Sequence, residues 1–138
     1  MQTIPVTCAI IIHQEKVLAA CRGESMDLPG KWEFPGGKVD VDESPEQCLI
    51  REIREELNMD IKILVELPSV THVYPSKTIR LIPFTAVWTQ GEIRLFEHAE
   101  IRWLGKNELL SLDWASADLP IVHDLIENWV KLVSSKER

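Results

Sequence analysis

The stretch GGKVDVDESPEQCLIREIREELNMD, residues 36–60, decides the fold prediction because it gathers acidic side chains around one well-signalled helix. Its acids are Asp40, Asp42, Glu43, Glu46, Glu52, Glu55, Glu56 and Asp60, and the opposing bases are Lys38, Arg51 and Arg54. Like charges three or four residues apart destabilise a helix by about 0.2–0.5 kcal/mol per pair. The stretch is therefore either a solvated surface helix or a site that holds something positive.

The helix within this stretch has a clear start and a clear end. Ser44 is a favoured N-cap, Pro45 suits the first helical position, and Gln47 completes an S-x-x-Q capping box. Asn58 is a residue type that often ends a helix in the left-handed conformation. Spacings of three and four place one apolar stripe, made of Leu49, Ile50, Ile53 and Leu57, on one face. The neighbouring face is acidic and consists of Glu52, Glu55 and Glu56.

Two features favour a metal site over a plain surface helix. Charges of alternating sign suit solubility, whereas these glutamates share one face. The glycine pair Gly36–Gly37 lets the backbone come close, so that a carbonyl oxygen can join the carboxylates. Such oxygen ligands suit Mg²⁺, which takes one or two carboxylates, several waters and phosphate oxygens. We therefore expect Mg²⁺, or Mn²⁺ in its place, bound against a phosphate chain.

The rest of the sequence interleaves predicted strands with a second substantial helix. Residues 6–22 are predicted as a hairpin with a turn at 14–16, residues 23–32 as a loop, and residues 32–39 as a short interrupted strand. Residues 60–75 and 77–90 are predicted as an antiparallel pair of long strands, and 92–96 and 101–105 as shorter strands. A helical turn is expected at 106–112 and an amphipathic helix at 118–133. This pattern predicts one α/β layered domain, residues 1–138, with a mixed sheet.

Composition and charge argue against several classes of protein. The formal net charge of −7 disfavours a nucleic-acid polymer or an anionic membrane as partner, but it is compatible with a small anionic ligand that arrives with metal ions. No apolar run approaches the roughly 18 residues of a membrane span. The first residues, MQTIPVTCAIII, have no basic residue before their apolar stretch. We therefore expect no signal peptide and a cytoplasmic protein.

The cysteines and histidines do not predict a metal centre. The cysteines are too few and too scattered for a disulfide framework or a zinc site, and we expect buried free thiols at Cys8, Cys21 and Cys48. The histidines show no ligand spacing and are expected on the surface or in strands; they are His13, His72, His98 and His123.

Residues 37–59 resemble the Nudix box: glycine, five residues, Glu, seven residues, Arg-Glu, an apolar residue, any residue, Glu-Glu, any residue, glycine and an apolar residue. The matching positions are Gly37, Glu43, Arg51, Glu52, Ile53, Glu55, Glu56, Asn58 and Met59. The one departure is Asn58 for glycine, which the helix-end geometry tolerates. With the preceding WEFPGG and the order of strands, nearly the whole chain is similar to MutT-type Nudix hydrolases. The resemblance implies the Nudix fold, an α/β/α sandwich with a mixed β-sheet.

The resemblance also implies roles for individual residues. In such enzymes the arginine of the box, here Arg51, orients a helix glutamate, and Glu43 supports the loop. The metal-ligand positions match Glu52, Glu55 and Glu56 with the Gly37 backbone nearby. A glutamate from a later loop acts as ligand or base; Glu97 matches it best and Glu100 is the second choice. Candidates for substrate contact are Arg22 and Lys77 at the phosphates, Asp118 at the base, and Phe34 or Trp32 as a stacking or core aromatic.

The implied reaction is Mg²⁺-dependent hydrolysis of a nucleoside triphosphate to a nucleoside monophosphate and pyrophosphate. An ionised Asp118 only accepts hydrogen bonds and suits a base with an amino group, such as cytosine or adenine, whereas an Asn would suit the mixed edge of 8-oxoguanine better. A protonated Asp118 would also donate. On this chemistry a cytidine-type triphosphate is favoured over 8-oxo-dGTP. Asp118 would equally serve as the N-cap of the last helix. Two alternatives stay open: a Nudix hydrolase of another nucleoside diphosphate derivative, and a non-catalytic nucleotide-sensing domain. The chain is expected to be a monomer or a homodimer, with no nucleic-acid polymer and no membrane as partner.

Overall fold

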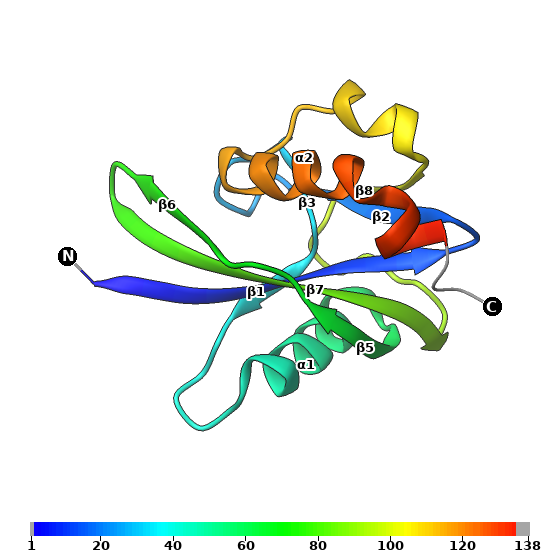
Figure 1. The fold of residues 1–138 in the computed structure, drawn as a ribbon. Coiled ribbons are helices and arrows are strands. Elements are labelled where there is room, and N and C mark those ends of the chain that lie inside the picture. The colour runs from blue at the N-terminus through cyan, green and yellow to red at the C-terminus, as the bar shows by residue number, and fades with distance from the viewer. Residues whose placement is uncertain (1, 135–138) are drawn as a thin grey trace.

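The two longest strands lie side by side and parallel in the middle of one mixed sheet (Figure 1). The computed structural model describes residues 2–134. β1 (Thr3–His13) pairs with β7 (Lys77–Gln90) from Thr3 opposite Thr78 to Ile12 opposite Val87. The remaining strands pair antiparallel and are β2 (Lys16–Cys21), β3 (Trp32–Glu33), β4 (Gly36–Lys38), β5 (Asp60–Glu66), β6 (Val70–Tyr74) and β8 (Glu100–Leu104). The predicted mixed sheet is confirmed.

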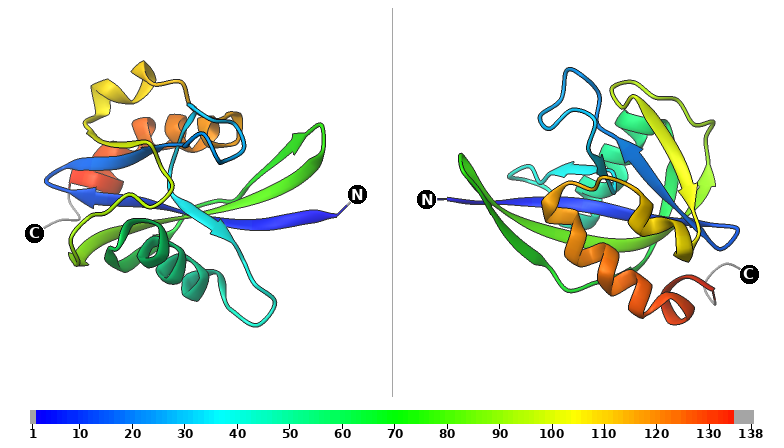
Figure 2. Two further views of the ribbon diagram at one scale, coloured as in Figure 1. Left: turned by 180° about the vertical axis from the view of Figure 1, so that it is seen from behind. Right: turned by 90° about the horizontal axis from the view of Figure 1, so that it is seen from above.

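Helices cover both faces of this sheet. α1 (Pro45–Leu57) lies on one face and α2 (Leu119–Glu127) on the other (Figures 1 and 2). Successive side chains of a strand point to opposite faces. On β1, Cys8, Ile10 and Ile12 accordingly join the core beneath α2, while Ala9 and Ile11 join the core beneath α1. Shorter helical segments are η1 (Lys106–Ser111), η2 (Ser116–Asp118) and a π-helical segment, Val130–Ser134. The expected α/β/α sandwich is confirmed.

α1 begins and ends where the sequence predicts. The Ser44 hydroxyl accepts from the Gln47 N–H at 3.1 Å, and the Gln47 side chain accepts from the Ser44 N–H at 2.9 Å. Asn58 ends the helix in the left-handed conformation, with a φ of 57°. The predicted burial of Ile50 is wrong, because its side chain is 38% exposed whereas Cys48 is fully buried. The buried arc of the helix is shifted towards Cys48, so Ile50 falls at the outer edge of that arc.

β1 begins at Thr3, three residues before the predicted start, and the larger differences from the predicted boundaries lie elsewhere. The expected strand at 60–75 is two strands, because the chain leaves the sheet at 67–69, where Pro68 has no N–H to donate. Residues 92–96 are not a strand; the Arg94 N–H instead donates to the carbonyl oxygen of Leu57 at the end of α1, at 2.9 Å. The last helix does not continue to residue 133, because α2 stops at Glu127 and the π-helical segment follows.

The hairpin turn agrees with expectation, and the cysteines do so except that Cys21 is only half-buried. Gln14 and Glu15 link β1 to β2 and both have positive φ, 51° and 58°, as a tight hairpin turn requires. All three cysteines are free thiols; Cys8 and Cys48 are buried, and Cys21 is half-buried. In residues 2–134 no helix combines the length and the apolar character needed to cross a membrane.

Candidate functional site

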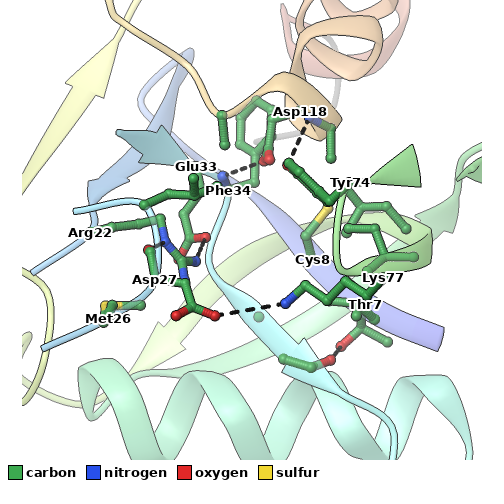
Figure 3. A pocket seen from close by; sticks show the side chains of 18 of the residues that line it. Thr7, Cys8, Arg22, Met26, Asp27, Glu33, Phe34, Tyr74, Lys77 and Asp118 are labelled. Atoms are coloured by element: carbon green, nitrogen blue, oxygen red, sulfur yellow. Dashed lines mark hydrogen bonds and ion pairs between the residues drawn. The ribbon is translucent and has the colours of Figure 1, made fainter. Parts of the chain in front are cut away.

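A cavity of about 640 Å³ opens between β1, the β6–β7 hairpin, the 22–31 loop and the segment that precedes α2 (Figure 3). Figure 2 shows the hairpin and the loop on the same side of the molecule. Seven residues predicted for the site line this cavity: Arg22, Phe34, Gly37, Glu52, Glu56, Lys77 and Asp118. Residues that the sequence reading did not select also line it, among them Cys8, Asp27, Glu33 and Tyr74. The cavity is acidic towards α1 and largely apolar towards α2.

Glu56 lies at the acidic end of the cavity, where one of its carboxyl oxygens has no partner. Its Oε1 atom is buried and has no hydrogen-bond partner. Burial, together with the charges of Glu33, Glu52 and Glu97, raises the pKa of this carboxyl to about 9, while the charge of Arg22 opposes the shift. A carboxyl held neutral in this way ionises readily only when a cation arrives beside it. The orphaned oxygen and the surrounding acids therefore fit a metal ion.

Arg51 connects the loop before α1 to two glutamates of the helix. Its Nη2 and Nε donate to the Glu43 carboxylate at 2.6 and 3.0 Å, and its Nη1 donates to Glu52 at 2.9 Å and to Glu55 at 3.2 Å. Hydrogen bonds from Arg51, and one from the Asp40 N–H, lower the pKa of Glu43 to about 2. The hydrogen bonds of Arg51 to Glu43, Glu52 and Glu55 raise the pKa of the guanidinium. The guanidinium thus fixes the direction in which Glu52 points.

The structure separates the glutamates that the motif groups together. At about 100° per residue, Glu52 and Glu56 fall between Cys48 and Leu49 on the buried arc of α1, and both line the cavity. Glu55 falls outside this arc, and its side chain is 57% exposed. Its carboxylate contacts Arg51, the residue that also holds Glu52.

The two later glutamates also take different positions. Glu97 is exposed on the segment before β8, yet its charge reaches Glu56 and raises the pKa of that carboxyl. Glu100, the second choice, begins β8 and accepts from Arg102 at 2.9 Å. Of the two, Glu97 is the one in electrostatic contact with the α1 acids.

Gly37 brings the backbone of β4 against α1. An added Cβ there would lie 2.3 Å from Oε2 of Glu52, so the glutamate occupies the space that a side chain would fill. The Gly37 carbonyl oxygen accepts from the Thr7 hydroxyl at 3.2 Å and from the Cys48 thiol at 3.5 Å. In residues 2–134 no three His, Cys, Asp or Glu side chains converge into a complete metal cage. Mg²⁺ commonly takes only one or two carboxylates and completes its shell with water and phosphate oxygens.

Asp118 lies at the opposite, apolar end of the cavity. Its side chain is 5% exposed, and Oδ2 accepts from the Phe34 N–H at 2.9 Å. The expected N-cap role is wrong, because the Asp118 side chain makes no capping hydrogen bond to α2. Burial raises the pKa of this carboxyl to about 8, and the nearby charge of Glu33 acts in the same direction. Asp118 is therefore mostly neutral at pH 7, and can donate as well as accept a hydrogen bond.

Aromatic side chains shape this apolar end. Phe34 lines the cavity and also packs on Trp114, with ring centroids 4.8 Å apart. The Tyr74 hydroxyl accepts from the Ala117 N–H at 3.3 Å, which ties the β6–β7 hairpin to η2. Trp32 is buried in the core, with Arg102 5.0 Å from its ring centroid. Of the two aromatics proposed from the sequence, Phe34 is thus the one at the cavity.

Two cations lie between the acidic and apolar ends. Arg22 donates to the Glu33 carboxylate and to the carbonyl oxygen of Asp27. Lys77 approaches the Asp27 carboxylate at 3.8 Å from across the mouth of the cavity (Figure 3).

The Glu33 carboxylate also forms a hydrogen bond with His98, which is buried, so the expectation of a surface or strand position for His98 is wrong. Glu33 was within the WEFPGG signal, whereas no spacing in the sequence pointed to its partner 65 residues away.

Comparisons with known proteins agree with the fold and with the family resemblance. The family described as "NUDIX domain" matches residues 3–125. A CTP pyrophosphohydrolase of Escherichia coli is 35% identical over 122 residues, covering 88% of this chain and 90% of that protein. An 8-oxo-dGTP diphosphatase of Proteus vulgaris is 38% identical over 77 residues, which cover 56% of this chain and 69% of that protein. The solution structure of the Escherichia coli ORF135 protein matches with a TM-score of 0.82 and 32% identity, covering 93% of this chain and 91% of that chain.

Proposed function

Because this chain belongs to the Nudix family of hydrolases, we propose that it cleaves nucleoside triphosphates to a nucleoside monophosphate and pyrophosphate. The observation that carries the proposal is a single cavity with carboxylates at one end, two cations in the middle and a buried hydrogen-bonding carboxyl at the other. That order matches metal ions, a phosphate chain and a base. The names of the similar proteins, a CTP pyrophosphohydrolase and an 8-oxo-dGTP diphosphatase, support the same class of substrate.

Nudix hydrolases generally need a divalent metal ion, and the acidic end of this cavity fits one. Glu52 and Glu56 would hold Mg²⁺, or Mn²⁺ in its place, with Glu55, Glu97 and the backbone at Gly37 as further ligands. When bound, the metal would neutralise phosphate charge and lower the pKa of a water molecule. The orphaned Oε1 of Glu56 supports this assignment, because a dication satisfies that atom and offsets the repulsion among the acids.

The side chains around the metal site position the reactants. Arg51 holds Glu52 in the direction of the cavity and keeps Glu55 beside it. Arg22 and Lys77 would exchange their present carboxylate partners for phosphate oxygens as the substrate enters. One of the glutamates, with Glu97 among the candidates, would accept the proton of the attacking water. Phosphoryl transfer depends mainly on such positioned charge.

The base pocket suits more than one nucleotide. The preference for cytidine rested on an ionised Asp118, but its raised pKa means that this side chain presents both a donor and an acceptor near pH 7. Such a pair of groups can bind the amino edge of cytosine and the keto edge of 8-oxoguanine. We propose that the protein acts on both classes, as a monomer or a homodimer, and that it clears such nucleotides from the pool. The net charge of −7 supports a small triphosphate over a nucleic-acid polymer.

The proposal is tested by assaying a panel of unmodified and oxidised nucleoside triphosphates for pyrophosphate release. With Mg²⁺ present we expect turnover of dCTP and 8-oxo-dGTP, with one pyrophosphate and one monophosphate formed per substrate. Chelation with EDTA should reduce the rate by at least about 10³-fold, because the phosphate charge is then no longer neutralised. Release of inorganic phosphate in place of pyrophosphate, or turnover of dinucleotides alone, would contradict the proposed reaction.

Replacing Gly37 by alanine should lower activity by displacing the Glu52 carboxylate from the proposed metal site, with little effect on the rest of the fold. The new methyl group would occupy the position of the Glu52 carboxylate and displace that flexible side chain. We expect kcat to fall about 10²-fold, the cost typical of a displacement of roughly 1 Å in an active site. Because only a side-chain end must move, the melting temperature should change little. The variant Gly105→Ala, whose added Cβ meets only the Glu108 side chain at 3.3 Å, serves as the control. Undiminished kcat in Gly37→Ala would show that the position of Glu52 is not critical.

A further inference from the structure

His98 is a buried side chain within an otherwise exposed segment. Leu95 and Phe96 are 40% and 61% exposed, and Glu97 and Ala99 are exposed as well, whereas His98 is 5% exposed. A histidine in a surface segment normally keeps its ring in water. Its burial next to Glu97 therefore indicates that the ring anchors this segment to the body of the protein.

The His98 ring forms a hydrogen bond with Glu33, a residue that lines the cavity. Nε2 of His98 lies 2.9 Å from Oε2 of Glu33, and a carboxylate oxygen accepts, so Nε2 carries the proton. The other Glu33 oxygen accepts from Arg22, which completes a chain from His98 to Glu33 to Arg22. Nδ1 of His98 is buried without a hydrogen-bond partner. An unsatisfied buried nitrogen costs about 1–3 kcal/mol, so the position is not favoured by stability alone.

The backbone around Glu97 fits closely against the residues of the site. The Ala99 N–H donates to the carbonyl oxygen of Cys21 at 2.9 Å, and the Phe96 N–H to that of Glu56 at 3.4 Å. A Cβ added to Gly23 would lie 2.1 Å from the carbonyl oxygen of Glu97, so only glycine permits this approach. These contacts bring the Glu97 charge near enough to Glu56 to raise its pKa.

We propose that His98 is a positioning residue that holds Glu97 against the acids of α1 by fastening residues 95–99 to Glu33. This role rests on the proposed function, because it assigns Glu97 to the metal end of the same cavity. The hydrogen bond from Phe96 is the longest of the backbone contacts, at 3.4 Å, so the segment depends on the His98 side chain for its position there. Loss of the ring contact should free Glu97 while leaving Glu52 and Glu56 in place.

The first measurement needs no turnover. We expect His98→Leu to raise the amide exchange of residues 95–98 at least about tenfold, with α1 unchanged, because local opening exposes these amides. Mn²⁺ binding, followed by electron paramagnetic resonance without nucleotide, should weaken about tenfold, in the range seen when a residue supporting a metal ligand is lost. His98→Gln, which can still donate to Glu33, should restore both values to within about twofold. His123→Leu, which removes an exposed histidine, is the control.

The second measurement is a double-mutant cycle. In the Glu97→Gln background, His98→Leu should weaken Mn²⁺ binding and kcat by less than about twofold, because the residue that it positions has already been neutralised. Equal losses in both backgrounds would overturn the proposal and show a purely structural role. If His98→Leu does not fold, His98→Asn, whose shorter amide cannot reach Glu33, carries the same expectations. If the wild type turns over no nucleotide, the proposed function fails, and the exchange and Mn²⁺ results still decide the role of His98.

Discussion

Replacing Glu56 by glutamine is expected to lower nucleoside triphosphate turnover by about 10³-fold or more, as the loss of a key charge in an active site does. The same change should stabilise the metal-free protein at alkaline pH. Glutamine keeps the shape of the side chain but cannot ionise, so it neither attracts a dication nor repels Glu33 and Glu52. A catalytic loss combined with a gain in stability distinguishes a metal-holding carboxylate from one that supports the fold.

The sign of the pH dependence follows from the raised pKa of Glu56. Its value is about 9 in the folded protein, against 4.5 for a free carboxyl. Between these values the folded state binds a proton that the unfolded state does not, so stability is lost as the pH rises. A proton bound only in the folded state lowers the free energy of unfolding by about 1.4 kcal/mol for each unit by which the pH rises. Allowing for partial solvent screening, we expect the wild type to lose about 2 kcal/mol between pH 5.5 and 8.5 from this group.

Thermal unfolding in EDTA at several pH values measures this effect. The free energy of unfolding of Glu56→Gln should exceed that of the wild type at pH 8.5, and the two should converge near pH 5.5. Added Mg²⁺ should reverse the order, since only the wild type gains stability by binding it. The exposed Glu66→Gln serves as the control and should follow the wild type. Parallel pH profiles for wild type and Glu56→Gln, or retained turnover, would contradict the metal assignment.

Features set by neighbours in the sequence were predictable in this chain. The capping box of α1 joins residues three apart, and the left-handed Asn58 closes the same helix, so local chemistry alone gives both ends. The predicted set of buried residues on α1 was less accurate, because the sequence does not show which arc of the helix faces the sheet. Once Cys48 is known to be buried, the same helical geometry explains why Glu52 and Glu56 line the cavity and Glu55 does not.

Features that depend on distant contacts were not predictable. Residues 92–96 alternate like a strand, but their backbone bonds to the end of α1 and no neighbouring strand receives it. The pair of Glu33 and His98 spans 65 residues and follows no spacing rule. The protonation of Asp118 depends on burial between Phe34 and the segment before α2, which no local pattern encodes. The resemblance to a known motif predicts the chemistry, whereas the raised pKa of Asp118 follows from its burial in the folded chain.

The choice between cytosine and 8-oxoguanine is expected to vary with pH, because Asp118 loses its proton near pH 8. A neutral carboxyl donates to the keto oxygen of 8-oxoguanine, whereas an ionised one only accepts and favours the amino group of cytosine. The ratio of kcat/KM for dCTP to that for 8-oxo-dGTP should therefore rise about tenfold from pH 6.5 to 9, the effect of one buried hydrogen bond. Taking the ratio cancels ionisations that affect both substrates equally, including that of Glu56.

Asp118→Asn is the matching variant, because an amide donates and accepts at every pH. In the variant, the ratio of kcat/KM for dCTP to that for 8-oxo-dGTP should stay near the value that the wild type has at low pH. At pH 9 this ratio should therefore be about tenfold lower in the variant than in the wild type. Asp113→Asn, which alters an acid that is 73% exposed and paired with Lys31, should leave the pH dependence intact. If the wild-type ratio is the same at all pH values, Asp118 does not read the base. Discrimination would then fall to the other groups that line the apolar end, such as Tyr74 and Cys8.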